Sequence, residues 1–336
     1  MRLEERAIGE AAGTILMHNV ADEAGTRVLK KGIRLTNEHL AELAAMGRTR
    51  VAVAVLEEGD VHEDEAARRI AEAAAGPGIT LSGVSEGRVN FEAAPGLLSV
   101  NVEALNRINS IEEVVLATMH DGQQVTEPRA VAGTRVVPLV VREEKILRVE
   151  AICAEYGHVV SVRPFRSLKV GVVTTGNEVF SGRIKDRFGP VIRKKFSRLG
   201  SSVMGQRLTS DDPAMTRDAI LAYAAEGAEM IVVTGGMSVD PDDQTPTAIR
   251  ATGAEIVTYG SPTFPGVMFL LAYLDGVPIL GLPGCVMYYR ASIFDLVVPR
   301  LLAGETVARE DIVALGHGGF CAACDVCRYP VCPFGK

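Results

Sequence analysis

The chain has 336 residues, of which 47% are hydrophobic and 23% charged. This composition is typical of a globular protein with two or three domains and excludes disordered, collagen-like and coiled-coil chains. The 35 basic and 42 acidic residues give a formal net charge of −7, and no long run of lysine and arginine is present, so nucleic acid is not an expected partner. No apolar run approaches the roughly 18 residues of a membrane helix, and the start MRLEERAIGE is too charged for a signal peptide. We therefore expect a cytoplasmic protein without membrane contact.

Residues 1–165 form a mixed α+β region in which helix-like and strand-like patterns follow one another without recognisable chemistry. A helical pattern ends at Gly47, the alternating VAVAVL that follows is typical of a strand, and an alanine-rich helix comes next. The expected helices are 36–46, 63–75 and 102–108, and the expected strands are 51–56, 97–102 and 134–141.

Residues 166–304 alternate short β-branched runs with helical segments, which predicts an α/β domain. Because its strands are apolar throughout, the sheet should be parallel and covered on both faces. Asp212-Pro213 and Thr245-Pro246 each place a capping residue before a proline in the first turn of a helix. The expected strands are KVGVVTTG, SSVMGQRL, AEMIVVTGG, AEIVTYG and VPILGLPG, and the expected helices are 189–199, 213–226, 246–252 and 286–302.

Three loops that follow strands of this domain share glycines and hydroxyl groups. Ligands of open parallel sheets gather at the carboxyl ends of the strands, where glycines let an anion approach the backbone and helix N-termini add partial positive charge. We therefore predict a site for a phosphate-bearing ligand at these loops. The candidate binding residues are Thr174, Thr175, Gly176, Asn177 and Glu178 in the first loop, Thr234, Gly235, Gly236 and Ser238 in the second, and Pro283 and Gly284 in the third.

The second loop continues into three closely spaced carboxylates, Asp240, Asp242 and Asp243. They would repel one another and a phosphate unless a cation lay between them, and Mg²⁺ held by carboxylates and phosphate oxygens is the usual arrangement. The alternative interpretation is a solvated acidic turn before the helix at Thr245.

The combination of TTGNE, TGG followed by an Asp-X-Thr-Pro segment, and LPG before an apolar helix resembles the molybdopterin-binding domain of molybdenum-cofactor biosynthesis proteins. That family includes molybdopterin adenylyltransferases, molybdenum insertases and competence-damage-inducible proteins. The resemblance implies a three-layer α/β/α fold with molybdopterin lying across the glycine-rich loops. It further implies that Asp243, with Asp242, serves metal-assisted catalysis and that Asp186 faces the ligand.

The amino-terminal half bears on the branch of the family. EAAGTILMHNV is similar to the opening segment of insertases, and LKKGIRLTNEHLAELAAMGRTRVAV resembles the insertase segment before the binding domain. The insertase motif of the type SAMDGYA is absent, whereas adenylyltransferases usually lack such a leading region. The chain therefore resembles an insertase-like protein that departs from the insertase pattern.

Residues 305–336 form a tail that carries Cys321, Cys324, Cys327 and Cys332. This spacing is close to the bacterial ferredoxin run C-x₂-C-x₂-C-x₃-C-P, with one additional residue before the fourth cysteine. Dense cysteines in a cytosolic chain indicate a metal site rather than disulfides. The tail could hold one [4Fe–4S] cluster or a Zn²⁺ ion, and a metal-free tail is the remaining alternative.

Taken together, these features predict a protein of molybdenum-cofactor biosynthesis that binds molybdopterin or adenylylated molybdopterin. The predicted chemistry is Mg²⁺-dependent molybdate insertion or adenylyl transfer. The alternatives are a non-catalytic molybdopterin carrier or redox sensor, and a nucleotide pyrophosphatase like the competence-damage-inducible proteins. From the family resemblance we also expect a homodimer, with molybdoenzymes as possible targets.

Overall fold

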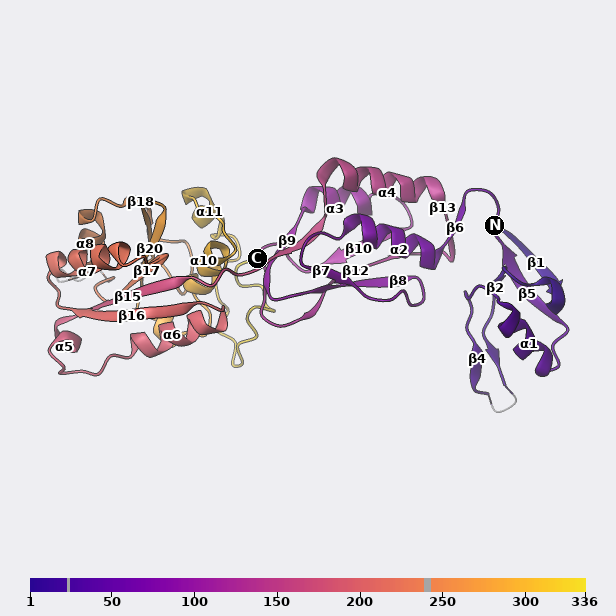
Figure 1. Ribbon diagram of the computed structural model, residues 1–336, viewed down its shortest axis with the longest axis horizontal. Coiled ribbons are helices and arrows are strands. Elements are labelled where there is room, and N and C mark those ends of the chain that lie inside the picture. Colours follow the sequence, from indigo (N-terminus) through magenta and orange to yellow (C-terminus); the bar gives the residue numbers. More distant parts are fainter. Residues whose placement is uncertain (23–24, 239–242) are drawn as a thin grey trace. The chain divides into compact units, whose positions relative to one another are not determined.

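The computed structural model describes residues 1–22, 25–238 and 243–336 (Figure 1). Asp240 and Asp242, two of the predicted metal ligands, lie outside the described residues. The chain divides into two compact units, which are described separately. Unit 1 comprises residues 1–93, 100–119 and 129–161, and unit 2 comprises residues 94–99, 120–128 and 162–336.

The first part of unit 1 is a small antiparallel sheet in which β5 lies between β1 and β2. Helix α1 begins after Thr36, whose side chain accepts a hydrogen bond from the backbone N–H of His39, and it buries Leu40 and Leu43 against the apolar side of this sheet. The elements are β1 (Arg2–Ala7), η1 (Ile8–Glu10), β2 (Ile15–Leu16), β3 (Val20–Ala21), β4 (Arg27–Leu29), α1 (Asn37–Ala45) and β5 (Arg50–Val55).

The second part of unit 1 is built around a four-stranded sheet of order β10-β12-β8-β7 with α2 packed against it. Helix α4, which the sequence patterns did not predict, packs against α2 and α3. The elements are β6 (Asp60–His62), α2 (Glu63–Ala74), β7 (Ile79–Leu81), β8 (Arg88–Ala93), α3 (Val102–Asn109), β10 (Val114–Thr118), β12 (Arg129–Val136), β13 (Val140–Arg142) and α4 (Glu143–Tyr156).

Unit 2 contains a six-stranded sheet of order β16-β15-β17-β20-β19-β18 (Figure 1). The four strands β16, β15, β17 and β20 are mutually parallel, as the apolar strand pattern predicts. The strands are β15 (Lys169–Thr175), β16 (Ser202–Thr209), β17 (Met230–Thr234), β18 (Glu255–Tyr259), β19 (Leu270–Leu274) and β20 (Val277–Leu282). The helices are α5 (Asn177–Phe180), α6 (Phe188–Arg198), α7 (Pro213–Ala225), α8 (Thr245–Ala251), α9 (Cys285–Tyr288), α10 (Ile293–Leu302) and α11 (Arg309–Ala314).

Successive residues of the central strands enter two separate cores on opposite faces of this sheet. Val172 packs with α6, α10 and α11, whereas the next residue, Val173, packs with α7 and α8. Tyr223 of α7 lies against the sheet where Gly171 leaves room: a Cβ on Gly171 would come within 2.5 Å of the Tyr223 ring. Helices thus cover both faces, which gives the layers of an α/β/α arrangement.

The expectation of an entirely parallel sheet is wrong for one strand. β19 runs antiparallel to both β18 and β20. The turn between β19 and β20 is the pair Asp275-Gly276, with φ angles of 50° and 83°. Asp-Gly between two apolar runs favours a tight hairpin, because both positions of such a turn require positive φ.

The long helix expected over residues 286–302 is also interrupted. One helical turn, α9, ends at Tyr288, and α10 begins after Ser292. The backbone N–H and the hydroxyl of Ser292 both donate to the Asp295 carboxylate, at 2.9 and 3.3 Å. This local capping competes with a continuous helix and starts a new one.

Short segments from the middle of the chain complete unit 2. β11 (Gln124–Val125) pairs with β9 (Gly96–Val100), and β14 (Val160–Arg163), along which the chain passes from unit 1 to unit 2, is the third strand of the same small sheet. The tail after α11 packs on this unit, with Phe334 buried and its ring 6.1 Å from that of Tyr329. Among the described residues, no helix combines the length and the apolar character needed to cross a membrane.

Candidate functional site

The three predicted loops follow β15, β17 and β20, which are neighbours in the sheet. Because these strands are parallel, their carboxyl ends lie at one edge. Thr174 and Thr234 pair across β15 and β17, and Thr234 pairs with Leu282 across β17 and β20. The topology therefore brings together the segments that the sequence separates by up to about a hundred residues.

Two buried threonines connect the first two loops. The hydroxyls of Thr174 and Thr234 are 3.0 Å apart, and both side chains are buried. Gln206 of the neighbouring strand β16 donates from Nε2 to Thr174 Oγ1 at 2.9 Å. These hydrogen bonds join β15, β16 and β17 at the sheet edge; ligand binding by Thr174 and Thr234 stays a prediction.

The backbone at Gly235 and Gly236 leaves no room for a side chain. Their φ angles are +87° and +55°, a region that L residues rarely adopt. A Cβ on Gly235 would lie 2.2 Å from the carbonyl oxygen of Thr175, and one on Gly236 would lie 2.7 Å from Thr245 Oγ1. Thr245 also donates from Oγ1 to the carbonyl of Gly235 at 2.8 Å. The second loop is therefore packed tightly against the first loop and the start of α8.

The first loop is held by the loop after β16. Thr175 donates from Oγ1 to the carbonyl of Ser210 at 2.8 Å, and the backbone N–H of Asn177 donates to Asp211 Oδ2 at 3.0 Å. Asn177 and Glu178 form the first turn of α5, and both are exposed. They present polar groups outward from a fixed backbone.

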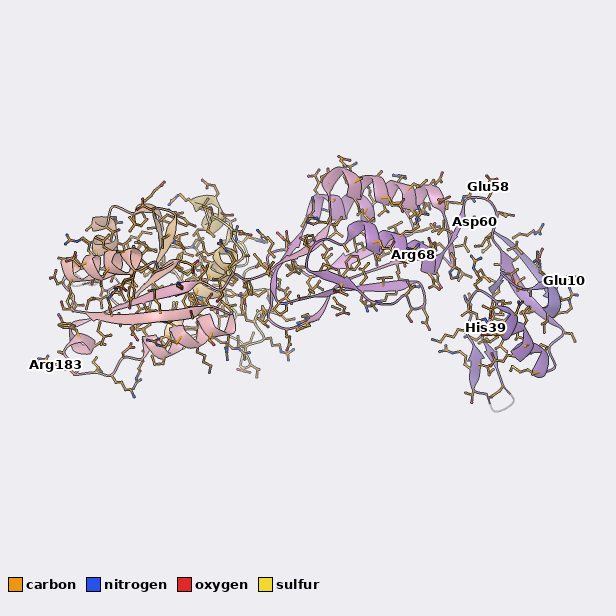
Figure 2. All side chains as sticks on the ribbon, in the orientation of Figure 1. Glu10, His39, Glu58, Asp60, Arg68 and Arg183 are labelled. Atoms are coloured by element: carbon orange, nitrogen blue, oxygen red, sulfur yellow. The ribbon has the colours of Figure 1, made fainter. Side chains whose placement is uncertain are left out.

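Asp186 caps the start of α6. Its carboxylate accepts hydrogen bonds from the backbone N–H groups of Phe188 at 2.9 Å and Gly189 at 3.0 Å, and from Gln206 Nε2 at 2.8 Å. This arrangement satisfies the orphan donors of the helix and occupies both carboxylate oxygens. Arg183, in the loop between α5 and α6, is exposed beside α5 (Figure 2).

Asp243 folds the second loop back on itself. Its Oδ2 accepts a hydrogen bond of 2.6 Å from the backbone N–H of Ser238, and the carboxylate is only half-buried. The Ser238 side chain is exposed. An ionised carboxylate has two oxygens with about four lone-pair sites, so the bond from Ser238 leaves Asp243 with the capacity to bind a cation. The chemistry of this donor fits Mg²⁺, which is commonly held by one or two carboxylates together with phosphate oxygens.

The third loop combines a buried residue with an exposed one. Pro283 is buried, and Gly284 is exposed with no atom within 4 Å of an added Cβ. Cys285 follows at the start of α9, where burial raises the pKa of its thiol and so disfavours the reactive thiolate. The loop therefore offers backbone rather than side-chain chemistry.

The four tail cysteines are all free thiols. Cys324 is exposed, while Cys321, Cys327 and Cys332 are partly buried. Across residues 1–22, 25–238 and 243–336, no three histidine, cysteine or acidic side chains are grouped as ligands of a metal ion. Metal binding by the tail stays a prediction from the spacing of its cysteines.

Gln206 is the residue of this edge that the sequence patterns missed. It connects Thr174 to Asp186 and therefore couples three elements of the site. A Cβ on Gly189 would lie 2.1 Å from Gln206 Oε1, so a larger residue at the helix start would displace the Gln206 side chain. A polar residue within a β-strand is the signal that could have found it.

Comparison with known families agrees with this geometry. Residues 171–303 match the family described as "Probable molybdopterin binding domain". The chain contains a molybdopterin-binding domain. Outside this domain, residues 6–55 match a domain of unknown function.

The chain has distant relatives of two kinds. A CinA-like protein from Mycobacterium sp. (strain MCS) is 37% identical over 92 residues, which are 27% of this chain and 22% of the relative. The molybdopterin molybdenumtransferase of Staphylococcus aureus (strain COL) is 28% identical over 160 residues, which are 45% of this chain and 38% of the relative. The matched regions thus span well under half of these relatives.

Among solved structures, the molybdopterin biosynthesis MoeA protein of Pyrococcus horikosii is 17% identical, with a TM-score of 0.34. The alignment covers 90% of this chain and 75% of that one.

Proposed function

We propose that unit 2 binds molybdopterin, free or adenylylated, across the loops after β15, β17 and β20. The observation that carries the proposal is the packing of Gly235 and Gly236 against Thr175 and Thr245, which leaves backbone and small polar groups at the strand ends. Such a surface lets phosphate oxygens approach main-chain N–H groups closely. The match of residues 171–303 to the molybdopterin-binding family supports the same ligand.

We further propose that the protein carries out a Mg²⁺-dependent step on this ligand, molybdate insertion or adenylyl transfer. Asp243 would hold the ion through its carboxylate, together with Asp242 or Asp240. The ion supplies charge neutralisation at the phosphate. The protein contributes positioning: Ser238 N–H orients the Asp243 carboxylate, and Asp211 fixes the first loop through Asn177. Similarity to a molybdopterin molybdenumtransferase favours insertion.

The decisive experiment supplies the full chain with adenylylated molybdopterin, Mg²⁺ and molybdate under anaerobic conditions and measures AMP release. We expect molybdate-dependent release, and we expect Asp243→Asn to reduce it by about a hundredfold or more, since electrostatic groups at phosphoryl centres commonly contribute that much. Asp218→Asn is the matched control, because Asp218 is exposed on α7 and pairs with its neighbour Arg217. Equal activity of the wild type and Asp243→Asn would refute the catalytic assignment.

Two other outcomes correspond to the remaining functions. Tight molybdopterin binding without AMP release would indicate a carrier, for which the cysteine tail would act as a redox sensor. Hydrolysis of a simple dinucleotide to mononucleotides would indicate a pyrophosphatase, the alternative that the sequence motifs left open. Absence of any molybdopterin binding would refute the ligand itself.

A further inference from the structure

Unit 2 contains a cavity whose lining shares no residue with the predicted molybdopterin site. Its volume is about 590 Å³, within the range of roughly 300–1,000 Å³ typical of small-molecule sites. One wall is the second half of α6, another is the segment that joins α9 to α10, and a third is Tyr329-Pro330 of the tail. Gln124 and Thr126, from the segment that includes β11, complete it.

The charge of this cavity is opposite to that of the chain. Four basic side chains, Lys194, Lys195, Arg198 and Arg290, line it together with one carboxylate, Asp295. The Asp295 carboxylate is already bound to Lys195 Nζ at 2.7 Å. Within the part of the chain that the structure describes, no ion pair involves the other three basic side chains, although the chain as a whole carries a formal charge of −7. Three uncompensated cations around one cavity favour a polyanion.

Two tyrosines at the cavity are unusually exposed. Tyr288 is 76% and Tyr289 49% exposed, and both follow directly on the buried start of α9. Aromatic rings normally contribute to stability through burial, so adjacent exposed rings at a cavity favour a planar partner. Arg290 follows in the sequence and lines the same cavity as the two rings.

The walls of the cavity are fixed by interactions below its surface. Lys195 Nζ donates to the carbonyl of Arg290 at 3.2 Å as well as to Asp295, and so joins α6 to the segment after α9. Tyr329 donates from its hydroxyl to the carbonyl of Asp295 at 2.7 Å, and Gln124 Nε2 donates to the Tyr329 hydroxyl at 2.8 Å. The tail is thereby held as a wall, so the cavity is formed before any ligand arrives.

We propose that this cavity binds a phosphorylated ligand with a planar ring, of the mononucleotide class. The phosphate contacts Arg198, Arg290 and Lys194, and the ring lies against Tyr288 or Tyr289. Arginine suits this role because its planar fork forms paired hydrogen bonds with phosphate oxygens. The site is independent of the molybdopterin site, and its failure would leave the proposed function untouched.

The test measures binding of AMP, inorganic phosphate and adenosine to the full chain by titration calorimetry. We expect AMP to bind more tightly than either fragment, and more weakly at high ionic strength. Arg198→Gln and Arg290→Gln should each weaken AMP binding about tenfold, the usual effect of losing a hydrogen bond between charged groups. Tyr288→Ala should weaken AMP binding and leave phosphate binding unchanged.

Arg309→Gln is the matched control, because Arg309 is exposed at the start of α11 and does not line the cavity. The proposal is overturned if AMP does not bind, or if Arg309→Gln weakens binding as much as the cavity variants do. It is also overturned if AMP binds with unchanged affinity to Arg198→Gln and Arg290→Gln, which would place the nucleotide elsewhere. Far-UV circular dichroism of each variant checks that the fold is retained.

Discussion

Replacing Gly235 by alanine tests the packing on which the predicted molybdopterin site depends. The backbone there has φ +87°, and an L residue in the left-handed region costs about 1–2 kcal/mol. The added Cβ would also lie 2.2 Å from the carbonyl oxygen of Thr175, a main-chain atom that cannot rotate away. Forced displacement of packed atoms costs about 1–3 kcal/mol.

One opposing effect reduces the expected loss of stability. Alanine restricts the unfolded chain more than glycine does, which stabilises the folded state by about 0.4–1 kcal/mol. The net expectation for Gly235→Ala is a loss of about 1–4.5 kcal/mol in the free energy of unfolding. The variant should also lose molybdopterin affinity, because the second loop must move away from β15.

Two other glycines separate the contributions. Gly253 has φ +84° with open space around it, so Gly253→Ala carries the backbone strain alone and should cost no more than about 1 kcal/mol. Gly284 has φ −55° and open space, so Gly284→Ala should leave stability unchanged or raise it slightly. All three glycines lie in unit 2, and each substitution replaces one α-hydrogen by a methyl group.

Urea unfolding followed by far-UV circular dichroism gives the three differences, and hydrogen exchange of peptides from residues 169–304 assigns the transition to unit 2. The reasoning fails if Gly235→Ala is no less stable than Gly253→Ala. It fails for the binding site alone if Gly235→Ala is destabilised as expected yet binds molybdopterin normally.

Three further expectations concern the remainder of unit 2. Lys195→Met should lower the free energy of unfolding by about 3–5 kcal/mol, because it leaves the Asp295 carboxylate buried without its cation. Burial raises the pKa of Asp295, so this loss of stability should shrink as the pH falls and the carboxyl group becomes protonated. Urea unfolding at several pH values measures the change. Burial, together with the nearby Asp295, holds the pKa of Tyr329 well above its ordinary value of 10.0, although the residue stays partly exposed. The neutral phenol therefore stabilises the tail below pH 10, and this stabilisation is lost as the pH rises further. Tyr329→Phe should remove that pH dependence, which is measured by hydrogen exchange of the tail. If the tail holds a metal, anaerobic protein should contain iron or zinc by elemental analysis and Cys327→Ser should lower its content, whereas equal metal in both proteins would disprove ligation by this cysteine.

Local patterns in the sequence were sufficient for most of unit 2. Asp212 and Pro213 mark the start of α7, and its N-cap hydrogen bond to Ala214 N–H is present at 2.8 Å. The parallel arrangement of β16, β15, β17 and β20 followed from their apolar composition. β19 was not among the expected strands, although Asp275-Gly276 after its apolar run is a hairpin signal, because a short apolar run does not by itself distinguish a strand from a helical segment.

The sequence did not predict the hydrogen-bond partners of individual side chains. Thr174 and Thr234 were expected to bind a ligand, and in the fold their hydroxyls face each other inside the sheet edge. Asp186 was expected to face the ligand, and its carboxylate caps α6 and binds Gln206. A motif gives the residue type and its place on the chain, but the direction of a side chain depends on strand register and on neighbours from other elements.

By itself, the sequence determined the α/β class of residues 166–304, the three glycine-rich loops and the family of the domain, because these depend on local periodicity, turn residues and motifs. Only the tertiary structure brought Gln206 to Thr174 and assembled the cavity between α6, the segment after α9 and the tail. Lys195 and Asp295 are a hundred residues apart, and their contact arises from packing two helices on one face of the sheet. Such long-range contacts leave no periodic trace in the chain, since each partner alone has the pattern of an ordinary charged residue on a helix.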